Sequence, residues 1–431
     1  MANWISSQKI KNKKSTMNIY CQSLRSKELL ENIVIKTPLE KNEFYSKQHN
    51  ANIYFKREDL QVGRSYKIRG AYSKIRQLNN KEKAIGVVCA SAGNHAQGVS
   101  IACSMLDIKG IIFMPITTPK QKIRKVVDFG GENIKIELVG DSFDQTKQIA
   151  IDYSDKHNKT FIHPFDDQKV IAGQGTVGLE IIDQKEFDID MLIVPIGGGG
   201  LAAGICEVFK TLSPKTKIIG VEPNGAPSMS SAINNKKPTL VSLTDNFVDG
   251  AAVKKVGDLN YKLCVNSLEK IITVCEGRIS SVILKLYNEQ GIVVEPAGAL
   301  TISALELLKQ NELRDKNVVC IISGGNNDIS RTEEIKERAL IYEELKHYFL
   351  INFPQRPGAL RDFVTQIIGP KDDITFFQFS KKHNKETGPA VVGIELSNKQ
   401  NLGDIYRKMK TRNYQYEYLN QNSLLFNQLI G

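Results

Sequence analysis

Residues 191–204 read MLIVPIGGGGLAAG, an apolar run that ends in four consecutive glycines and continues into a stretch of small, helix-forming residues. A continuous apolar run, unlike an alternating one, predicts a strand that is buried on both faces. Because glycines lack Cβ atoms, a glycine loop can close around an anion and direct several backbone amides at it. A structural turn needs only one or two glycines, so we interpret this loop as the binding site of a single phosphate group.

The spacing of the loop argues against two larger phosphate ligands. It lacks the lysine and hydroxyl of G-x-x-x-x-G-K-[ST], which bind nucleoside triphosphates. It also lacks the G-x-G-x-x-G spacing, with an acidic residue downstream, that binds dinucleotides.

Similar apolar runs recur along the chain, with helical patterns between them. The runs occupy 84–90, 110–116, 217–223 and 317–325, and the helical patterns occupy 94–106, 119–129, 142–156, 201–212 and 298–310. Strands that alternate with helices predict an α/β fold with mainly parallel sheets in three layers. In such sheets, ligands collect where the strands end.

The pattern changes near residue 345. A charged amphipathic helix is predicted over 331–347, and the elements after it have the order β-α-β-β-α-β, which is typical of a ferredoxin-like α+β domain. The strands are predicted at YFLINF (348–353), 374–380, 389–396 and 414–419, and the helices at about 358–368 and 401–411. We therefore expect an N-terminal extension (1–24), an α/β domain (25–340) and a second domain (345–420).

Composition narrows the class of protein. The chain has 431 residues, 41% hydrophobic and 24% charged, which is typical of a soluble globular protein. It has no apolar run of membrane-spanning length and no secretory signal, so we expect a cytoplasmic protein. Residues 1–27 carry six basic residues and no acid. We interpret them as a solvated extension, with an organelle-targeting peptide as the alternative.

The net charge of +11 raises the question of nucleic-acid binding. The lysines are spread along the chain and match no nucleic-acid motif, so we expect no nucleic-acid partner. The seven cysteines include no C-x-x-C pair, and most lie in apolar company. They are therefore expected to be reduced core thiols, and we expect no metal site.

The segment KREDLQVGRSYKIRGAY (56–72) contains a candidate reactive lysine, Lys67. A lysine that forms a Schiff base must lose its proton, so burial or cationic neighbours must lower its pKa. Arg64 and Arg69 are candidate neighbours. Without further context, Lys67 is equally well explained as one of many surface lysines.

Two further loops follow apolar strands. SAGNHAQG (91–98) begins a helix whose first amides can bind a carboxylate, and Asn94 offers both a donor and an acceptor there. The alternative is that Ser91 or Asn94 caps the helix. In IISGGNND (321–328), Ser323 is a candidate ligand, or a residue that simply ends the strand.

Together, these four segments resemble the threonine dehydratase group of fold-type II pyridoxal-phosphate enzymes, over about residues 30–420. The resemblance implies that Lys67, in an S-[FY]-K-x-R-G-A motif, forms the Schiff base with pyridoxal 5'-phosphate. It also implies that Tyr66 packs against the ring, that Asn94 contacts the ring hydroxyl and that Ser323 meets the pyridine nitrogen. The phosphate is then expected to be bound by Gly197, Gly198, Gly199, Gly200 and the amide of Leu201.

The resemblance further implies deamination of L-threonine to 2-oxobutanoate, the committed step of isoleucine biosynthesis, with L-serine as a poorer substrate. A broad serine/threonine dehydratase remains an alternative, because one methyl group is commonly worth only about 10- to 200-fold in discrimination. A non-catalytic amino-acid sensor is a second alternative. Ala92 stands where racemising members of the group carry a serine, so racemisation is expected to be poor.

The group's architecture implies two α/β lobes with parallel or mixed sheets, the small lobe (about 58–160) being inserted in the large one. INFPQRPGALRDFV (351–364) resembles an ACT-like regulatory domain that senses isoleucine and valine, although Gln355 stands where glutamate is expected. A structural or dimerising role is the alternative. The group usually forms homodimers or homotetramers. Glu295 is either a pocket acid or part of a core junction, and His163 is expected to be structural.

Overall fold

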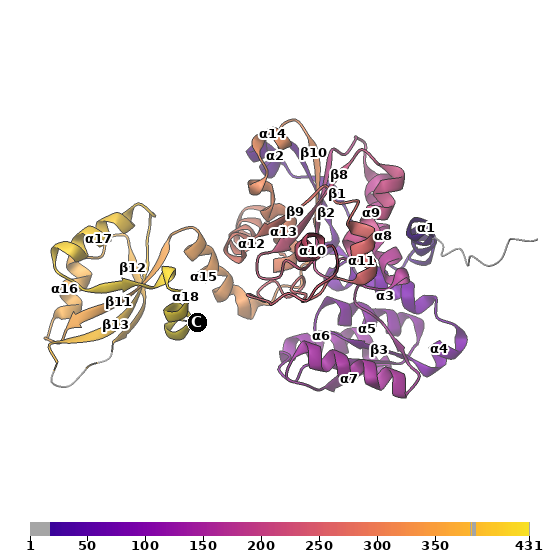
Figure 1. Cartoon of the computed structure of the whole chain (residues 1–431), viewed down its shortest axis with the longest axis horizontal. Helices are drawn as coiled ribbons and strands as arrows, with labels where there is room; N and C mark the ends of the chain where they lie inside the picture. The colour runs from indigo at the N-terminus through magenta and orange to yellow at the C-terminus, as the bar shows by residue number, and fades with distance from the viewer. Residues whose placement is uncertain (1–17, 380, 382–384, 431) are drawn as a thin grey trace, which may run out of the picture. The chain divides into compact units, whose positions relative to one another are not determined.

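The computed structural model describes residues 18–379, 381 and 385–430 (Figure 1). Most of the basic N-terminal segment, residues 1–17, lies outside the described residues. The chain divides into two compact units, one formed by residues 1–274 and 294–326 and the other by residues 275–293 and 327–431.

The first unit contains a six-stranded sheet in the order β1-β2-β10-β7-β8-β9. Its neighbouring strands are parallel except for β1, which pairs antiparallel with β2. The middle residues of the central strands, such as Ile193 and Cys320, are completely buried, as continuous apolar runs predict. The strands are β1 (Leu39–Lys41), β2 (Asn52–Arg57), β7 (Met191–Pro195), β8 (Lys217–Pro223), β9 (Lys270–Val274) and β10 (Asn317–Ile322).

The helices of this larger lobe connect the strands in chain order. Helix α1 packs on α8 and α9, with Ile19 buried and Ser26 Oγ 2.7 Å from Ser73 Oγ. The helices are α1 (Ile19–Leu29), α2 (Glu43–His49), α8 (Gln168–Gln184), α9 (Gly200–Leu212), α10 (Ser228–Asn234), α11 (Asp258–Cys264), α13 (Pro296–Ser303) and α14 (Gln310–Leu313).

A second, all-parallel sheet of four strands, in the order β5-β4-β3-β6, forms the smaller lobe of the same unit (Figure 1). Its strands are β3 (Val87–Ala90), β4 (Gly110–Met114), β5 (Ile134–Leu138) and β6 (Thr160–Phe161). Its helices are α3 (Lys67–Arg76), α4 (Asn80–Ile85), α5 (Asn94–Leu106), α6 (Lys120–Gly130) and α7 (Phe143–Lys156). The predicted α/β architecture with mainly parallel sheets is confirmed.

The strand ends bring the glycine loop and Ser323 to one edge of the larger sheet. Strands β7 and β10 are parallel neighbours, with Leu192 opposite Val319. β7 ends at Pro195, just before the glycines, and β10 ends at Ile322, just before Ser323. The carboxyl ends of parallel strands form the edge where α/β proteins bind ligands.

One helix prediction in this unit is too long. The helix expected over 298–310 ends at Ser303, and a 3₁₀ turn, Leu305–Leu307, follows it. Ala304 and Leu305 are nevertheless completely buried. The apolar pattern there reflects burial in a turning segment, which periodicity cannot separate from a buried helix.

The second unit contains an antiparallel sheet in the order β12-β13-β11-β14. The element order β11-α16-β12-β13-α17-β14 confirms the ferredoxin-like prediction, and the aromatic core includes Phe349, Phe353 and Phe363. The elements are β11 (Lys346–Pro354), α16 (Ala359–Gln366), β12 (Asp373–Phe379), β13 (Thr387–Glu395), α17 (Asn401–Thr411) and β14 (Tyr416–Tyr418). A final helix, α18 (Ser423–Leu429), was not predicted.

Two helices outside this sheet also belong to the second unit. Helix α12 (Glu276–Gln290) packs on α15 (Thr332–Tyr342), with Gly277 facing Tyr342 and Ser281 Oγ donating to a carboxylate oxygen of Glu343. Helix α15 connects to the sheet through Glu337, which accepts from the Tyr348 hydroxyl. None of the helices in the described part of the chain combines the length and the apolar character that crossing a bilayer requires.

Candidate active site

Lys67 is the first residue of α3, and its Nζ donates to the backbone carbonyl of Pro164 at 3.0 Å. The residue keeps part of its surface open. Burial nevertheless lowers the pKa of Lys67 to about 8, against a smaller opposing effect of the Glu295 carboxylate. At pH 7, about a tenth of such amines are neutral. Lys67 is therefore set apart from the surface lysines as a usable nucleophile.

The cause of this lowered pKa differs from the one that the sequence suggested. Arg69 is completely buried, and it is committed to two carboxylates instead of acting on Lys67. It donates to both oxygens of Glu58, at 2.8 Å each, and to both oxygens of Glu180, at 2.6 and 2.9 Å. Lys56 Nζ also donates to Glu180, at 2.7 Å. The charges of the two cations, Arg69 and Lys56, are balanced by those of the two carboxylates. These ion pairs hold the start of α3 against β2 and α8.

The glycine loop connects β7 to α9. Gly199 has a φ of 90°, in the left-handed region that favours glycine. A Cβ at Gly198 would overlap the ring of Phe165, and one at Gly200 would lie 2.8 Å from the Phe165 carbonyl oxygen. The first amides of α9, including that of Leu201, have no intrahelical acceptor. The loop therefore fits a phosphate group at a helix N-terminus.

A buried side chain that the sequence reading missed supports this loop. Asn260, in α11, donates from Nδ2 to the carbonyl oxygens of Gly198 (2.7 Å) and Phe165 (3.1 Å). Since Asn260 has no exposed surface, it fixes the loop from behind. An isolated asparagine outside any motif offered no signal for this role.

Asn94 is the first residue of α5, and its side chain does not cap the helix. Its Nδ2 lies 2.7 and 2.9 Å from the two carboxylate oxygens of Glu295, and its Oδ1 accepts from Asn326 at 2.8 Å. Glu295 is buried, and burial raises its pKa to about 7, while the hydrogen bond from Asn94 lowers it. Between the two readings of Glu295, this geometry favours the pocket acid.

Ser323 is buried beside the same group of residues. Its Oγ donates to the carbonyl oxygen of Ala297 at 3.2 Å, and its own carbonyl accepts from the Tyr66 amide at 3.3 Å. Glu295 N donates to the next carbonyl, that of Gly324, at 3.2 Å. The backbone of Ser323 and Gly324 is thus tied to Tyr66 and Glu295, and the Tyr66 ring lies 5.4 Å from Lys67 Nζ.

Two histidines near Lys67 are neutral. Burial lowers the pKa of His95 to about 3 and that of His163 to about 4. His163 Nδ1 accepts from the amides of Phe165 and Asp166, at 3.3 and 2.8 Å. This contact supports the expected structural role of His163, because it shapes the turn that carries Pro164 and Phe165.

These residues fit pyridoxal phosphate. A buried lysine with a lowered pKa suits an aldehyde, a glycine loop at a helix N-terminus suits a phosphate, and the Asn94 amide offers a donor for a ring hydroxyl. Contacts connect the parts directly, since Lys67 reaches Pro164 and the adjoining Phe165 packs on the glycine loop.

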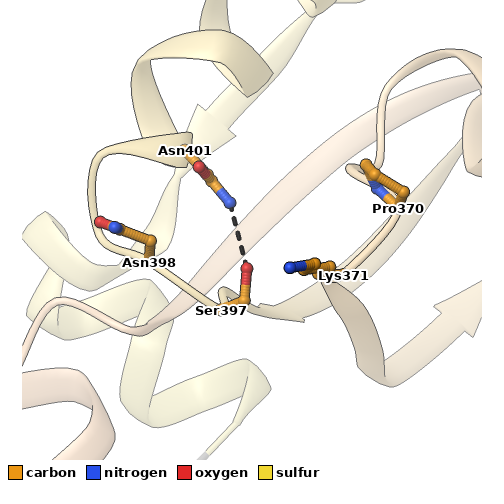
Figure 2. Close-up of a pocket in the computed structure, with 5 residues that line it drawn as sticks. All are labelled: Pro370, Lys371, Ser397, Asn398 and Asn401. Carbon is orange, nitrogen blue, oxygen red and sulfur yellow. Dashed lines mark hydrogen bonds between the residues drawn. The ribbon is translucent and has the colours of Figure 1, made fainter.

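The second unit has a separate polar pocket of about 540 Å³, lined by Pro370, Lys371, Ser397, Asn398 and Asn401 (Figure 2). Asn401 Nδ2 donates to Ser397 Oγ at 3.3 Å and to Asp372 at 2.9 Å. None of the residues predicted for the cofactor lines this pocket.

Comparison with known proteins gives matches in both parts of the chain. Residues 30–324 match the family of pyridoxal-phosphate dependent enzymes, and residues 337–429 match the C-terminal regulatory domain of threonine dehydratase. The chain is 50% identical over 401 residues to the L-threonine dehydratase biosynthetic IlvA of Halalkalibacterium halodurans, covering 93% of this chain and 96% of that protein. It is 49% identical over 409 residues to its counterpart in Bacillus subtilis, covering 94% and 96%.

Solved structures of similar proteins have the same fold as a large part of this chain. The processed form of threonine deaminase isoform 2 from Solanum lycopersicum superposes with a TM-score of 0.70 at 38% identity, covering 74% of this chain and 93% of that one. A serine racemase from Dictyostelium discoideum superposes with a TM-score of 0.65 at 30% identity, covering 73% and 100%.

Proposed function

This chain belongs to the pyridoxal-phosphate-dependent enzymes, as a member of the biosynthetic L-threonine dehydratases, and on that premise we propose that it converts L-threonine to 2-oxobutanoate and ammonia by eliminating water. The observation that carries the proposal is the position of Lys67. Its partly neutral amine lies where the small lobe meets the glycine loop at the edge of the larger sheet.

When bound, pyridoxal phosphate supplies the electron sink for the charge that proton loss leaves on the substrate. Lys67 would hold the cofactor through its amine, and the same amine would act as the base for the substrate α-proton. Gly197, Gly198, Gly199, Gly200 and the Leu201 amide bind the phosphate. Asn94 donates to the ring hydroxyl, and Ser323 places a hydroxyl, not a carboxylate, at the pyridine nitrogen. A hydroxyl would not keep that nitrogen protonated as a carboxylate would.

The proposal is tested with the full-length holoenzyme by following 2-oxoacid release from L-threonine. Lys67→Ala should abolish the visible absorbance of the bound cofactor and reduce turnover by about 10²- to 10⁴-fold or more. A Lys74→Ala variant is the matched control and should keep the absorbance, because this partly buried lysine of the same helix pairs with Asp167. Full turnover in Lys67→Ala would remove the basis of the proposal.

L-Serine is expected to be the poorer substrate, and the alternative is a broad serine/threonine dehydratase. A comparison of kcat/KM for the two amino acids separates these readings. A ratio near one would favour the broad enzyme. A non-catalytic sensor is disfavoured, because Lys67 is present and its pKa is lowered.

The regulatory part of the proposal concerns the second unit. Isoleucine or valine is proposed to act through the ACT-like domain. We propose domain bounds of 1–24 for the extension, whose last residues, from Ile19, begin α1, with 25–340 for catalysis and 345–420 for regulation. The match of residues 337–429 to a regulatory domain supports this assignment. A cytoplasmic homodimer or homotetramer is proposed from the family. Removing residues 345–431 should leave an active enzyme whose rate no longer responds to isoleucine, and inhibition that survives truncation would place the effector elsewhere.

A further inference from the structure

The amide of Asn94 is held at both ends, and the group at its oxygen end, Asn326, has a fixed donor role. Its nitrogen donates to the Glu295 carboxylate, which only accepts when ionised. Its oxygen accepts from Asn326 Nδ2 at 2.8 Å. Turning the amide over would place the Asn94 oxygen against a carboxylate and its nitrogen against another N–H. The bond from Asn326 would be lost in either protonation state of Glu295, and the bond to Glu295 would be lost when that carboxyl is ionised, so one orientation is preferred.

The orientation of Asn326 is fixed in turn by groups of unambiguous polarity. Its Nδ2 also donates to the backbone carbonyl of Gly63 at 2.8 Å, and a carbonyl can only accept. Its Oδ1 lies 3.4 Å from Lys125 Nζ, and an ammonium can only donate. Asn326 Nδ2 also donates to Gln97 Oε1, at the longer distance of 3.1 Å. Gly63 and Lys125 therefore fix the orientation of the Asn326 amide, and Asn326 in turn fixes the orientation of the Asn94 amide, whose nitrogen faces Glu295.

We propose that Asn326 and Glu295 are positioning residues that keep the Asn94 amide turned with its N–H toward the cofactor. The inference rests on the proposed function, in which Asn94 donates to the ring hydroxyl. The two Glu295 oxygens share the Asn94 nitrogen, and one N–H can serve both in a three-centre bond. The second N–H is then left for the ring hydroxyl.

The close packing around Glu295 explains why this carboxylate has a single position. A Cβ at Gly324 would overlap Glu295 Oε1, so glycine is required beside it. Glu295 N donates to the Gly324 carbonyl at 3.2 Å, which fixes the backbone as well. Ser323, Gly324 and Asn326 belong to the same loop. This one loop therefore fixes both hydrogen-bond partners of Asn94, namely Glu295 and Asn326.

The experiment titrates the visible absorbance of the bound cofactor with pH in full-length holoenzyme variants. An N–H donated to the ring hydroxyl stabilises its anionic form, so its loss should move the titration midpoint upward. We expect Asn94→Ala and Asn326→Ala to shift the midpoint by about one pH unit in the same direction. The double variant should shift no further than Asn94→Ala, because both changes remove one hydrogen bond.

Two further variants serve as controls for this experiment. Asn326→Leu keeps the approximate shape of the side chain, adds no charge and cannot donate to Asn94, so it should shift the midpoint as Asn326→Ala does, even if the alanine variant fails to fold. Asn224→Ala, an exposed asparagine, should leave the midpoint unchanged.

The outcomes separate the inference from the function it rests on. A parent-like titration in Asn326→Leu, or additive shifts in the double variant, would overturn the positioning role while leaving Asn94 assigned. A parent-like titration in Asn94→Ala would instead overturn the proposed role of Asn94 itself. Loss of the absorbance in Lys67→Ala tests the cofactor site independently of both.

Discussion

The guanidinium of Arg69 and the carboxylate of Glu58 form a two-point contact, with Nε and Nη2 each donating to one oxygen at 2.8 Å. Both side chains are completely buried. This geometry needs the planar fork of arginine, which lysine cannot reproduce. Because Arg69 follows Lys67 by two residues in α3, the contact fixes the position of the reactive amine.

Arg69→Lys should therefore lower the free energy of unfolding by about 1–3 kcal/mol, because donors to buried carboxylates are lost while the charge is kept. Urea denaturation monitored by circular dichroism measures the change. The control is Arg124→Lys, which alters an exposed ion pair with Asp128 and should cost less than about 0.5 kcal/mol. Equal effects at the two sites would contradict the role of the buried contact.

Gly198→Ala should weaken cofactor binding, because the new methyl group would overlap the Phe165 ring and push the loop out of shape. The expected rise in the dissociation constant of pyridoxal phosphate is about tenfold or more, measured by fluorescence titration of the apo-protein. A second substitution, Phe165→Ala, should restore part of the affinity by removing the obstacle. No recovery in the double variant would show that the overlap is not the cause.

Cofactor loading should depend on pH through the Lys67 amine. Its folded-state pKa of about 8 lies below the usual lysine value, so the neutral, reactive form increases as pH rises through 8. The rate at which apo-protein takes up pyridoxal phosphate should rise from pH 7, with a midpoint near 8, and level off by about pH 9.5. Stopped-flow absorbance follows the uptake, and a midpoint near the ordinary lysine pKa would contradict the effect of burial.

Gly277→Ala should destabilise the packing of α12 on α15, because the added Cβ would lie 2.6 Å from the Cβ of Tyr342. We expect a loss of about 1–3 kcal/mol, measured by thermal and chemical denaturation. The matched control is Gly403→Ala in α17, where nothing lies within 4 Å of the new methyl group. That change should stabilise the protein by up to about 1 kcal/mol, since alanine favours helices.

Residue patterns in the sequence predicted the fold and indicated the main candidate site residues. The apolar runs around Ile193 and Cys320 gave the parallel strands, because full burial leaves a continuous pattern. The lysine segment and the glycine loop lie in local motifs, so they were visible in the sequence.

The parts that the sequence did not reveal depend on contacts between distant segments. Asn326 receives its role from Gly63 and Asn94, which are more than 200 residues away in the chain. Arg69 pairs with Glu180, which is 111 residues away, and for that reason it was taken for a neighbour that lowers the Lys67 pKa. Periodicity carries no information about such partners. It also could not place α12 with the second unit, because its apolar face looks like that of any buried helix.

Helix α1 has a practical consequence for protein production. The family match begins at residue 30, which would make residue 30 a natural place to start a shortened recombinant chain. Such a truncation would delete Ile19 and Ser26 and would expose the surfaces of α8 and α9 that α1 covers. The newly exposed apolar surface would favour aggregation in the expression host.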